Sequence, residues 1–183
     1  MHDDIQQILL SEERILDGID RLAAAITEEY AGSDPVVVSV LKGSFVFASD
    51  LIRRLPFPLR LGFAAARSYR DGTRPGALEI ELMPSEEDVV GRRILLLDDI
   101  LDTGRTLSDI VRELERRGCE DVRTCVFLDK PGRRRVPFEA DYRAFEVEDV
   151  FVVGYGLDFA GRYRNLPFVA SLRPDVIAAQ VST

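Results

Sequence analysis

The chain has 183 residues, of which 46% are hydrophobic, so it is long enough to bury a core and is typical of one soluble α/β domain spanning residues 1–183. Its 24 basic and 32 acidic residues give a net charge of −8, which argues against wrapping nucleic acid and favours small-molecule partners. One histidine and two cysteines exclude Ser-His-Asp catalysis, histidine-rich metal sites and a disulfide framework, and the absence of a long apolar run predicts a cytoplasmic protein with no membrane span or signal peptide.

The first third of the chain predicts a helix, a strand and a second helix. Apolar residues recur at helical spacing over 11–31, with Ser11 as the N-terminal cap and Gly32 as the stop. The β-branched run PVVVSVL at 35–41 predicts a buried strand, and SFVFASDLIRRL at 44–55 predicts the next helix. The short KGS turn between them therefore lies at the end of a strand.

Two strands separated by a loop follow. LRLGFAAARSY predicts a strand that ends near Arg67, and ALEIELM at 77–83 alternates apolar and polar residues in the manner of a strand. Between them, RDGTRPG at 70–76 has the glycine, proline and charge content of a mobile loop. We therefore expect a flexible excursion from the sheet at this point.

The second half of the chain alternates strands with a helix. RRILLLDD at 92–99 predicts a buried strand, and 105–118 predicts a helix with one apolar face that stops at Gly118. DVRTCVFLDK at 121–130 and EDVFVVGYGLD at 148–158 predict two more strands. This alternation favours an α/β fold with a largely parallel, twisted, doubly wound sheet flanked by helices, whose ligands bind at the C-terminal ends of the strands.

Three acids stand together at the end of the strand at 92–99. Asp98, Asp99 and Asp102 lie within five positions, and Thr103 and Gly104 then begin a turn before a helix. The backbone N–H groups and dipole of such a turn bind phosphate, while carboxylates offer oxygens to a divalent metal or to ribose hydroxyls. The segment therefore predicts a site for a sugar phosphate with bound magnesium, because that ligand would relieve the repulsion between the acids.

Two other phosphate-binding motifs fail. A P-loop requires G-x-x-x-x-G-K-[ST], but the chain has no Gly-Lys pair, and KGS at 42–44 has the reverse order. GYG at 154–156 lacks the third glycine of a dinucleotide fingerprint, because Phe159 occupies its place. The remaining alternative is a polar strand end with an ordinary capping turn, which the density of polar groups disfavours.

At these residues the sequence resembles the phosphoribosyltransferases, whose signature is a short apolar strand, two acids, two apolar residues, an acid or Thr, and then Thr-Gly. LLLDDILDTGRT at 95–106 fits it throughout. Four further segments resemble, in the same order, the hypoxanthine (guanine) phosphoribosyltransferases: VLKGS at 40–44, SY at 68–69, LDKPGRR at 128–134 and FVVGYGLDFAGRYRNLP at 151–167. The resemblance implies the type I phosphoribosyltransferase fold, in which a small hood and a flexible lid accompany the sheet.

The resemblance further implies transfer of ribose 5-phosphate from phosphoribosyl pyrophosphate to N9 of hypoxanthine or guanine, with release of pyrophosphate. Asp102 is implied as the general base, facing N7 of the purine. The resemblance implies that the ribose and its 5-phosphate are bound by Asp98, Asp99, Asp102, Thr103, Gly104, Arg105 and Thr106, and the pyrophosphate by Lys42, Gly43 and Arg164. It implies that the base is bound by Lys130 (at O6), Phe151 (by stacking), Val152 and Asp158. It also implies that Mg²⁺ is bound by Asp98, Asp99 and Asp158, and that Ser68 and Tyr69 head a lid. Members of this subfamily are dimers or tetramers, so we expect a homo-oligomer.

Some alternatives stay open. An enzyme that prefers xanthine, or a regulator that keeps the fold but binds RNA or a protein, would share much of this pattern. On composition alone Phe151 would be a core residue, as most strand aromatics are. We interpret the three arginines at 133–135 as a solvated basic turn after a strand. Asp98 also stands where the subfamily commonly has Glu.

Overall fold

The structure is a computed structural model that describes residues 2–68 and 78–181, so Tyr69 and the loop predicted at 70–76 lie outside the described residues. Its strands are β1 (Ile5–Leu10), β2 (Val36–Leu41), β3 (Arg60–Ser68), β4 (Leu78–Leu82), β5 (Arg93–Leu101), β6 (Asp121–Asp129), β7 (Tyr142–Glu146), β8 (Val152–Val153) and β9 (Val169–Leu172). Its helices are α1 (Glu12–Tyr30), α2 (Phe45–Ile52), α3 (Glu86–Val89), α4 (Arg105–Arg116) and α5 (Pro174–Val181), with short 3-10 turns η1 (His2–Asp4) and η2 (Pro131–Arg133). Within these two ranges no helix is both long and apolar enough to cross a membrane.

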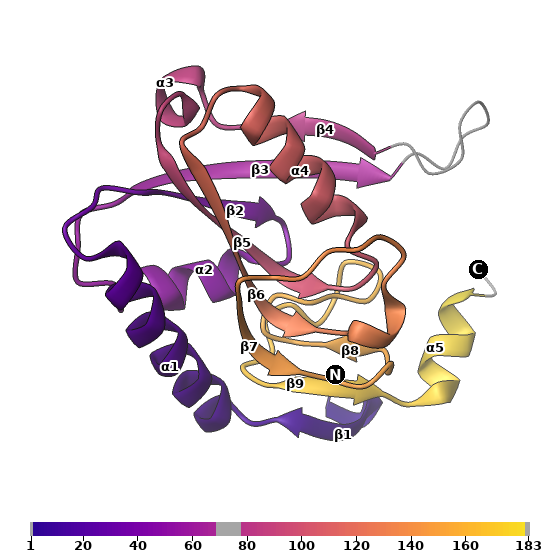
Figure 1. The fold of residues 1–183 in the computed structure, drawn as a ribbon. Helices are drawn as coiled ribbons and strands as arrows, with labels where there is room; N and C mark the ends of the chain where they lie inside the picture. Colours follow the sequence, from indigo (N-terminus) through magenta and orange to yellow (C-terminus); the bar gives the residue numbers. More distant parts are fainter. Residues whose placement is uncertain (1, 69–77, 182–183) are drawn as a thin grey trace.

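A six-stranded sheet in the order β4-β3-β2-β5-β6-β7 forms the centre of the fold (Figure 1). Its strands pair in parallel, except that β4 runs antiparallel to β3. Helices α1 and α2 pack in one core cluster with the sheet, and α4 packs in a second. This arrangement confirms the predicted α/β class with a largely parallel sheet.

Strand β5 explains how the two core clusters are built. Leu95 and Leu97 lie in the cluster that contains α1 and α2, whereas Ile94 and Leu96 lie in the cluster that contains α4. All four side chains are fully buried. A strand covered on both faces is apolar at every position rather than at alternate ones, which is why the sequence reads ILLL here.

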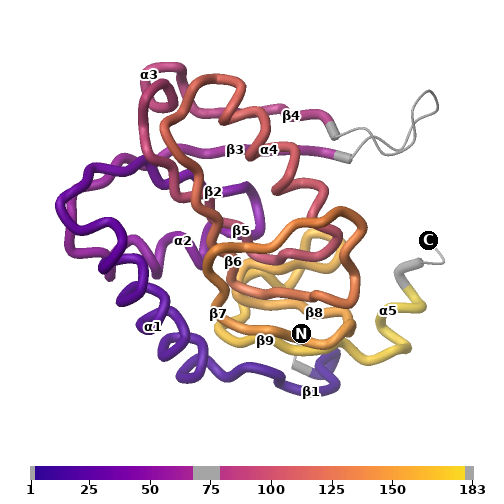
Figure 2. Tube along the Cα trace, viewed as in Figure 1, coloured from indigo at the N-terminus to yellow at the C-terminus, as the bar shows by residue number. Residues whose placement is uncertain are grey.

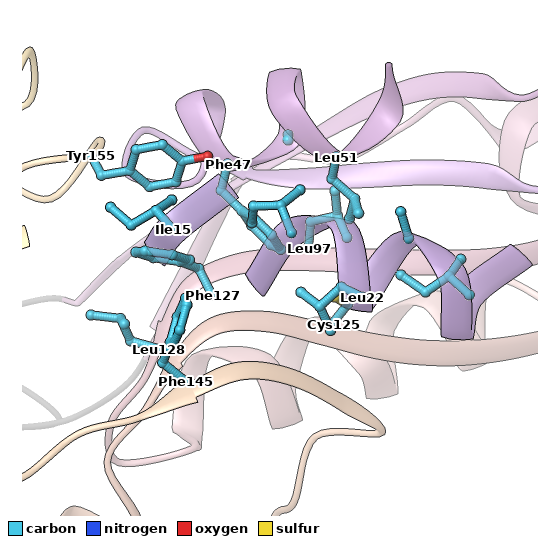
Figure 3. Packing of buried hydrophobic residues seen from close by; sticks show 14 of the residues in the cluster. Ile15, Leu22, Phe47, Leu51, Leu97, Cys125, Phe127, Leu128, Phe145 and Tyr155 are labelled. Atoms are coloured by element: carbon cyan, nitrogen blue, oxygen red, sulfur yellow. The ribbon is translucent and has the colours of Figure 1, made fainter. Parts of the chain in front are cut away.

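An aromatic cluster joins the sheet to the segment that follows β8 (Figure 3). The ring of Phe127 on β6 lies 4.7 Å from that of Tyr155 and 5.8 Å from that of Phe145, measured between centroids. The Tyr155 hydroxyl donates to Asp50 Oδ2 of α2 at 2.7 Å. These contacts fix the turn around Tyr155 against both β6 and α2.

A second, smaller sheet is antiparallel and has the order β1-β9-β8. It joins the two ends of the chain, since β1 pairs with β9 along its length. Figure 2 shows β1 in indigo beside β9 in yellow in the lower part of the view. This sheet corresponds to the small hood that the resemblance implies.

The main sheet opens at the carboxyl ends of β2 and β5. Pairing between these strands stops at Ser39 and Leu97, whereas β5 continues beside β6 as far as Leu101 and Asp129. From this point the chain builds the sheet outward in both directions, through β3 on one side and β6 on the other. Ligands of doubly wound sheets bind at such a switch point.

The prediction of a long strand at 148–158 is wrong. Only two of its residues form β8, because the chain then turns through Gly154, Tyr155 and Gly156, whose φ angles are +96°, +51° and +98°. These left-handed conformations are incompatible with a continuing strand. The sequence analysis also missed β1, α3, β7, β9 and α5, while the other predicted elements are confirmed with shifts of a few residues at their ends.

Candidate active site

Asp98 and Asp99 end the buried part of β5 at the switch point. The Asp98 side chain is only 6% exposed, and its Oδ1 accepts the backbone N–H of Asp99 at 2.9 Å. Burial raises the pKa of both carboxyl groups, and repulsion from Asp99 raises the pKa of Asp98 further. Hydroxyl donors or a cation placed here would therefore stabilise the charged forms of the pair.

The turn after these acids leads into helix α4 and encloses a small cavity. Gly104, with φ +81°, caps α4, and the N–H of Arg105 donates to Thr103 Oγ1 at 3.4 Å. A cavity of about 60 Å³ opens at this turn, lined by Asp98, Ile100, Leu101, Asp102, Thr103, Gly104, Thr106 and Leu107. The 12-residue helix α4 adds its positive dipole end, so the cavity suits an anion the size of a phosphate group.

Gly43 brings the end of β2 against the acids. A Cβ atom on Gly43 would overlap Asp99 Oδ2, and one on Gly156 would overlap the Gly43 carbonyl oxygen. The Asp99 carboxylate therefore packs on Gly43, and the backbone at Gly156 packs on the Gly43 carbonyl group, at distances that only glycine permits. Lys42 precedes Gly43 and is exposed. The contact of Gly156 with Gly43 was not predicted from the sequence, although Gly156 belongs to the GYG motif at 154–156.

Arg164 and Asp158 lie in the same corner. Arg164 Nη2 is 2.7 Å from Asp158 Oδ1, and its Nη1 donates to the Gly156 carbonyl oxygen at 2.7 Å. The Arg164 charge also acts on Asp99, where it lowers the pKa against the larger effect of burial. The residues predicted for pyrophosphate binding therefore lie together beside the acidic pair.

Lys130 follows β6 and faces the segment before β8. Its side chain is buried, its Nζ donates to the Val150 carbonyl oxygen at 2.6 Å, and burial lowers its pKa. Phe151 is 46% exposed, and its ring contacts that of Phe159 edge-on at 5.2 Å between centroids. Phe151 is thus not a core residue, and its ring is available to a ligand, whereas Val152 is buried in β8.

The arginines at 133–135 are not simply a solvated turn. Arg133 Nε lies 2.8 Å from Asp102 Oδ1, and Arg133 Nη1 lies 3.1 Å from Asp149 Oδ1. The Nε–H is not aimed at Asp102, whose Oδ1 is buried and accepts no hydrogen bond within the described part of the chain. Arg134 is mostly shielded and binds backbone carbonyl groups, so the prediction is wrong for Arg134.

The lid prediction is only partly within the described residues. Ser68 ends β3, and Tyr69 lies outside them. Just before the gap, Arg67 forms an ion pair with Glu81 at 3.3 Å between Nε and Oε1. Both side chains are exposed, so this pair contributes little to stability.

Residues 6–160 match the family model described as the phosphoribosyl transferase domain. The bifunctional protein TilS/HprT of Listeria innocua is 43% identical over 96% of this chain, and the match spans only 27% of that longer protein. The hypoxanthine-guanine phosphoribosyltransferase of Bacillus subtilis is 40% identical over 96% of this chain and 98% of its own length. Among solved structures, a hypoxanthine phosphoribosyltransferase from Staphylococcus aureus has a TM-score of 0.89 at 40% identity over 96% of each chain. The Trypanosoma cruzi hypoxanthine phosphoribosyl transferase, whose C-terminal region was studied for its role in oligomeric state and activity, has a TM-score of 0.92 at 34% identity over 100% of this chain and 99% of its own. On the matched family model and these relatives, this chain belongs to the phosphoribosyltransferase family.

Proposed function

We propose that the chain transfers ribose 5-phosphate from phosphoribosyl pyrophosphate to N9 of hypoxanthine or guanine in cytoplasmic purine salvage. The bond from C1 of the ribose to the pyrophosphate oxygen breaks, and a bond from C1 to N9 forms. The observation that carries the proposal is that one edge of the sheet holds both a small cavity at the turn 102–106 before α4 and a buried lysine near an exposed aromatic ring. The B. subtilis relative bears the corresponding name.

The phosphoribosyl pyrophosphate half of the substrate pair would bind at the switch point. The N–H groups of Thr103, Gly104, Arg105 and Thr106 would hold the 5-phosphate, and Asp98 and Asp99 would accept the ribose hydroxyls. Lys42, Gly43 and Arg164 would hold the pyrophosphate. The close packing of Gly43 on Asp99 supports this arrangement, because it places the two binding regions side by side.

The purine half would bind between Lys130 and Asp102. The Lys130 ammonium would donate to O6, which disfavours adenine because its 6-amino group is itself a donor. Phe151 would stack on the ring, and the backbone of Val152 and the region of Asp158 would contact its edge. Asp102 would accept the purine proton as general base at N7 once the base displaces Arg133, whose Nε lies 2.8 Å from Asp102 Oδ1; that Oδ1 accepts no hydrogen bond among the described residues.

Magnesium would be held by Asp98 and Asp99, with a second ion at Asp158. Two adjacent, shielded carboxylates with raised pKa values fit a hard divalent cation. The described residues contain no group of three or more His, Cys, Asp or Glu side chains that could hold a metal ion, so a magnesium ion here would need water and substrate oxygens to complete its shell. The bound ion would neutralise charge on the departing pyrophosphate. Ser68 and Tyr69 would head the lid that excludes water.

The test is an ultraviolet assay of the protein with phosphoribosyl pyrophosphate, magnesium, and hypoxanthine, guanine, xanthine, adenine or uracil in turn. We expect magnesium-dependent nucleotide formation with hypoxanthine and guanine but not with adenine. Faster turnover of xanthine would assign a different base. Ligand binding without turnover of any base would favour the regulatory alternative.

We also propose that the chain is a homo-oligomer, as the study of the T. cruzi relative suggests for that protein. Leu61 and Phe63 on β3, Leu82 on β4 and Phe45 on α2 are large apolar side chains at exposed positions. Leu61 and Phe63 pair with Val37 and Ser39 of β2, and Val37 lies in the core cluster of α1 and α2, so the two β3 residues extend that sheet face and a second copy would bury them. Phe63→Lys should lower the sedimentation coefficient towards that of a monomer, whereas Val90→Lys, which is exposed elsewhere, should not.

A further inference from the structure

Arg134 links two segments that carry different parts of the candidate active site. Its side chain is only 18% exposed. Its Nη1 lies 2.8 Å from the carbonyl oxygen of Leu101, 2.7 Å from that of Asp102 and 3.2 Å from that of Lys130. Because Nη1 carries two hydrogens, the longest of these is a shared contact. One guanidinium nitrogen therefore touches the backbone of both Asp102 and Lys130.

A buried carboxylate fixes the orientation of Arg134. Asp129 ends β6 with a side chain that is 2% exposed, and its Oδ1 binds Arg134 Nη2. Its Oδ2 lies 3.2 Å from Arg143 Nη1. On the other side, Arg134 Nε donates to the Phe138 carbonyl oxygen at 2.9 Å. A buried charge requires such partners, so the Arg134 fork has little freedom to rotate.

The sheet holds Lys130 against Leu101 but does not reach Asp102. The β5–β6 pairing ends at Leu101 and Asp129, and the last bond across it runs from the Lys130 N–H to the Leu101 carbonyl oxygen at 2.9 Å. Asp102 therefore lies one residue beyond the ladder. Arg134 Nη1 contacts the carbonyl oxygens of Asp102 and Lys130 at the point where the next hydrogen bond between the strands would form.

We infer that Arg134 is a positioning residue that sets the distance between Asp102 and Lys130 and so lets them bind N7 and O6 of one purine. This inference rests on the proposed function. N7 and O6 lie on the same edge of a purine, so the groups that bind them must keep a fixed separation. Arg134 acts on that separation through the two backbones and does not touch the base.

The test compares Arg134→Gln and Arg134→Lys with Arg143→Gln. Arg143 is the matched control, because it pairs with the same Asp129 but contacts neither Asp102 nor Lys130. Arg134→Lys keeps a charge for Asp129, so it serves if Arg134→Gln does not fold, yet its single ammonium cannot hold Asp129 and both carbonyl groups together.

The readout is the ratio of the dissociation constants of adenosine and inosine 5′-monophosphate, measured by calorimetry on each variant. The two nucleotides share the ribose 5-phosphate and differ at position 6, so the ratio reports base recognition and not phosphate binding. We expect both Arg134 variants to lower the ratio about tenfold, while ribose 5-phosphate affinity stays within about threefold and Arg143→Gln retains the wild-type ratio.

Two outcomes would overturn the inference. An unchanged ratio in the Arg134 variants would mean that Arg134 only stabilises its turn. An equal fall in Arg143→Gln would assign the effect to the charge of Asp129. A wild-type protein that does not distinguish the two nucleotides would instead count against the proposed base recognition itself.

Discussion

The phosphate side of the site and the base side are built in different ways. The proposed phosphate side, residues 98–106 with Lys42 and Gly43, combines the turn before α4 with two acids, one of which packs directly on glycine. The proposed base side, residues 129–135 and 149–152, is held by charged side chains that join neighbouring segments of the chain. The first should therefore tolerate no added atoms, and the second should respond to changes of charge and pH.

Asp102 lies between the phosphate side and the base side, and removing its charge should have the largest effect on turnover. If Asp102 is the general base, Asp102→Asn should lower kcat by a factor of about 10² to 10⁴, because the amide cannot accept the purine proton. The affinity for phosphoribosyl pyrophosphate should stay within about threefold, because the proposed phosphate site uses backbone groups. Initial rates and calorimetry measure the two quantities.

Asp109→Asn is the control for that substitution, since Asp109 lies on the exposed face of α4 and pairs only with Arg112 among the contacts found in the described residues. It should leave both quantities near wild type. Equal losses of turnover and of phosphoribosyl pyrophosphate affinity in Asp102→Asn would make Asp102 a structural residue of the loop.

A single added methyl group should break the phosphate side. Gly43→Ala would force a Cβ into Asp99 Oδ2, so we expect a loss of about 1–3 kcal/mol in the free energy of unfolding and a raised KM for phosphoribosyl pyrophosphate. Gly132→Ala is the matched control, because nothing lies within 4 Å of the position that its Cβ would take. Chemical denaturation and initial rates would show whether the two variants differ, and similar behaviour would refute the close packing.

These two sides also differ in how far the sequence predicts them. The phosphate side follows from a local pattern, in which a buried strand, acids, Thr103-Gly104 and a helix stand in one run of residues. Arg134 was misread as a solvated arginine, because its acceptors lie on segments from Leu101 to Phe138 that only the fold brings together. The long strand expected at 148–158 failed for a related reason, since its apolar run gave no sign that Gly154 and Gly156 adopt left-handed conformations.

The pH dependence of kcat/KM should distinguish the base side from the phosphate side. Burial lowers the pKa of Lys130 below its ordinary value of 10.5, so the ammonium that donates to O6 is lost at a lower pH than for an exposed lysine. We expect kcat/KM for hypoxanthine to fall on the alkaline side with a midpoint below 10.5. Lys130→Arg keeps its charge over this pH range and should move the alkaline fall of kcat/KM to higher pH. An unchanged alkaline fall in Lys130→Arg would assign it to another group.

The smallest effect is expected at Arg133. Its ion pair with Asp102 lies where the purine would approach, so Arg133→Ala should lower KM for hypoxanthine about two- to fivefold by removing a contact that the base must displace. Arg135→Ala, an exposed neighbour in the same turn, should leave KM unchanged. A raised KM in Arg133→Ala would instead show that Arg133 binds the base.

A crystal structure of the complex with inosine 5′-monophosphate would test the two-sided site most directly. The account predicts the 5′-phosphate at the N-terminus of α4, O6 bonded to Lys130 Nζ in place of the Val150 carbonyl oxygen, N7 facing Asp102, and the purine stacked on Phe151. A nucleotide whose phosphate lies at α4 but whose base points away from Lys130 and Phe151 would contradict it.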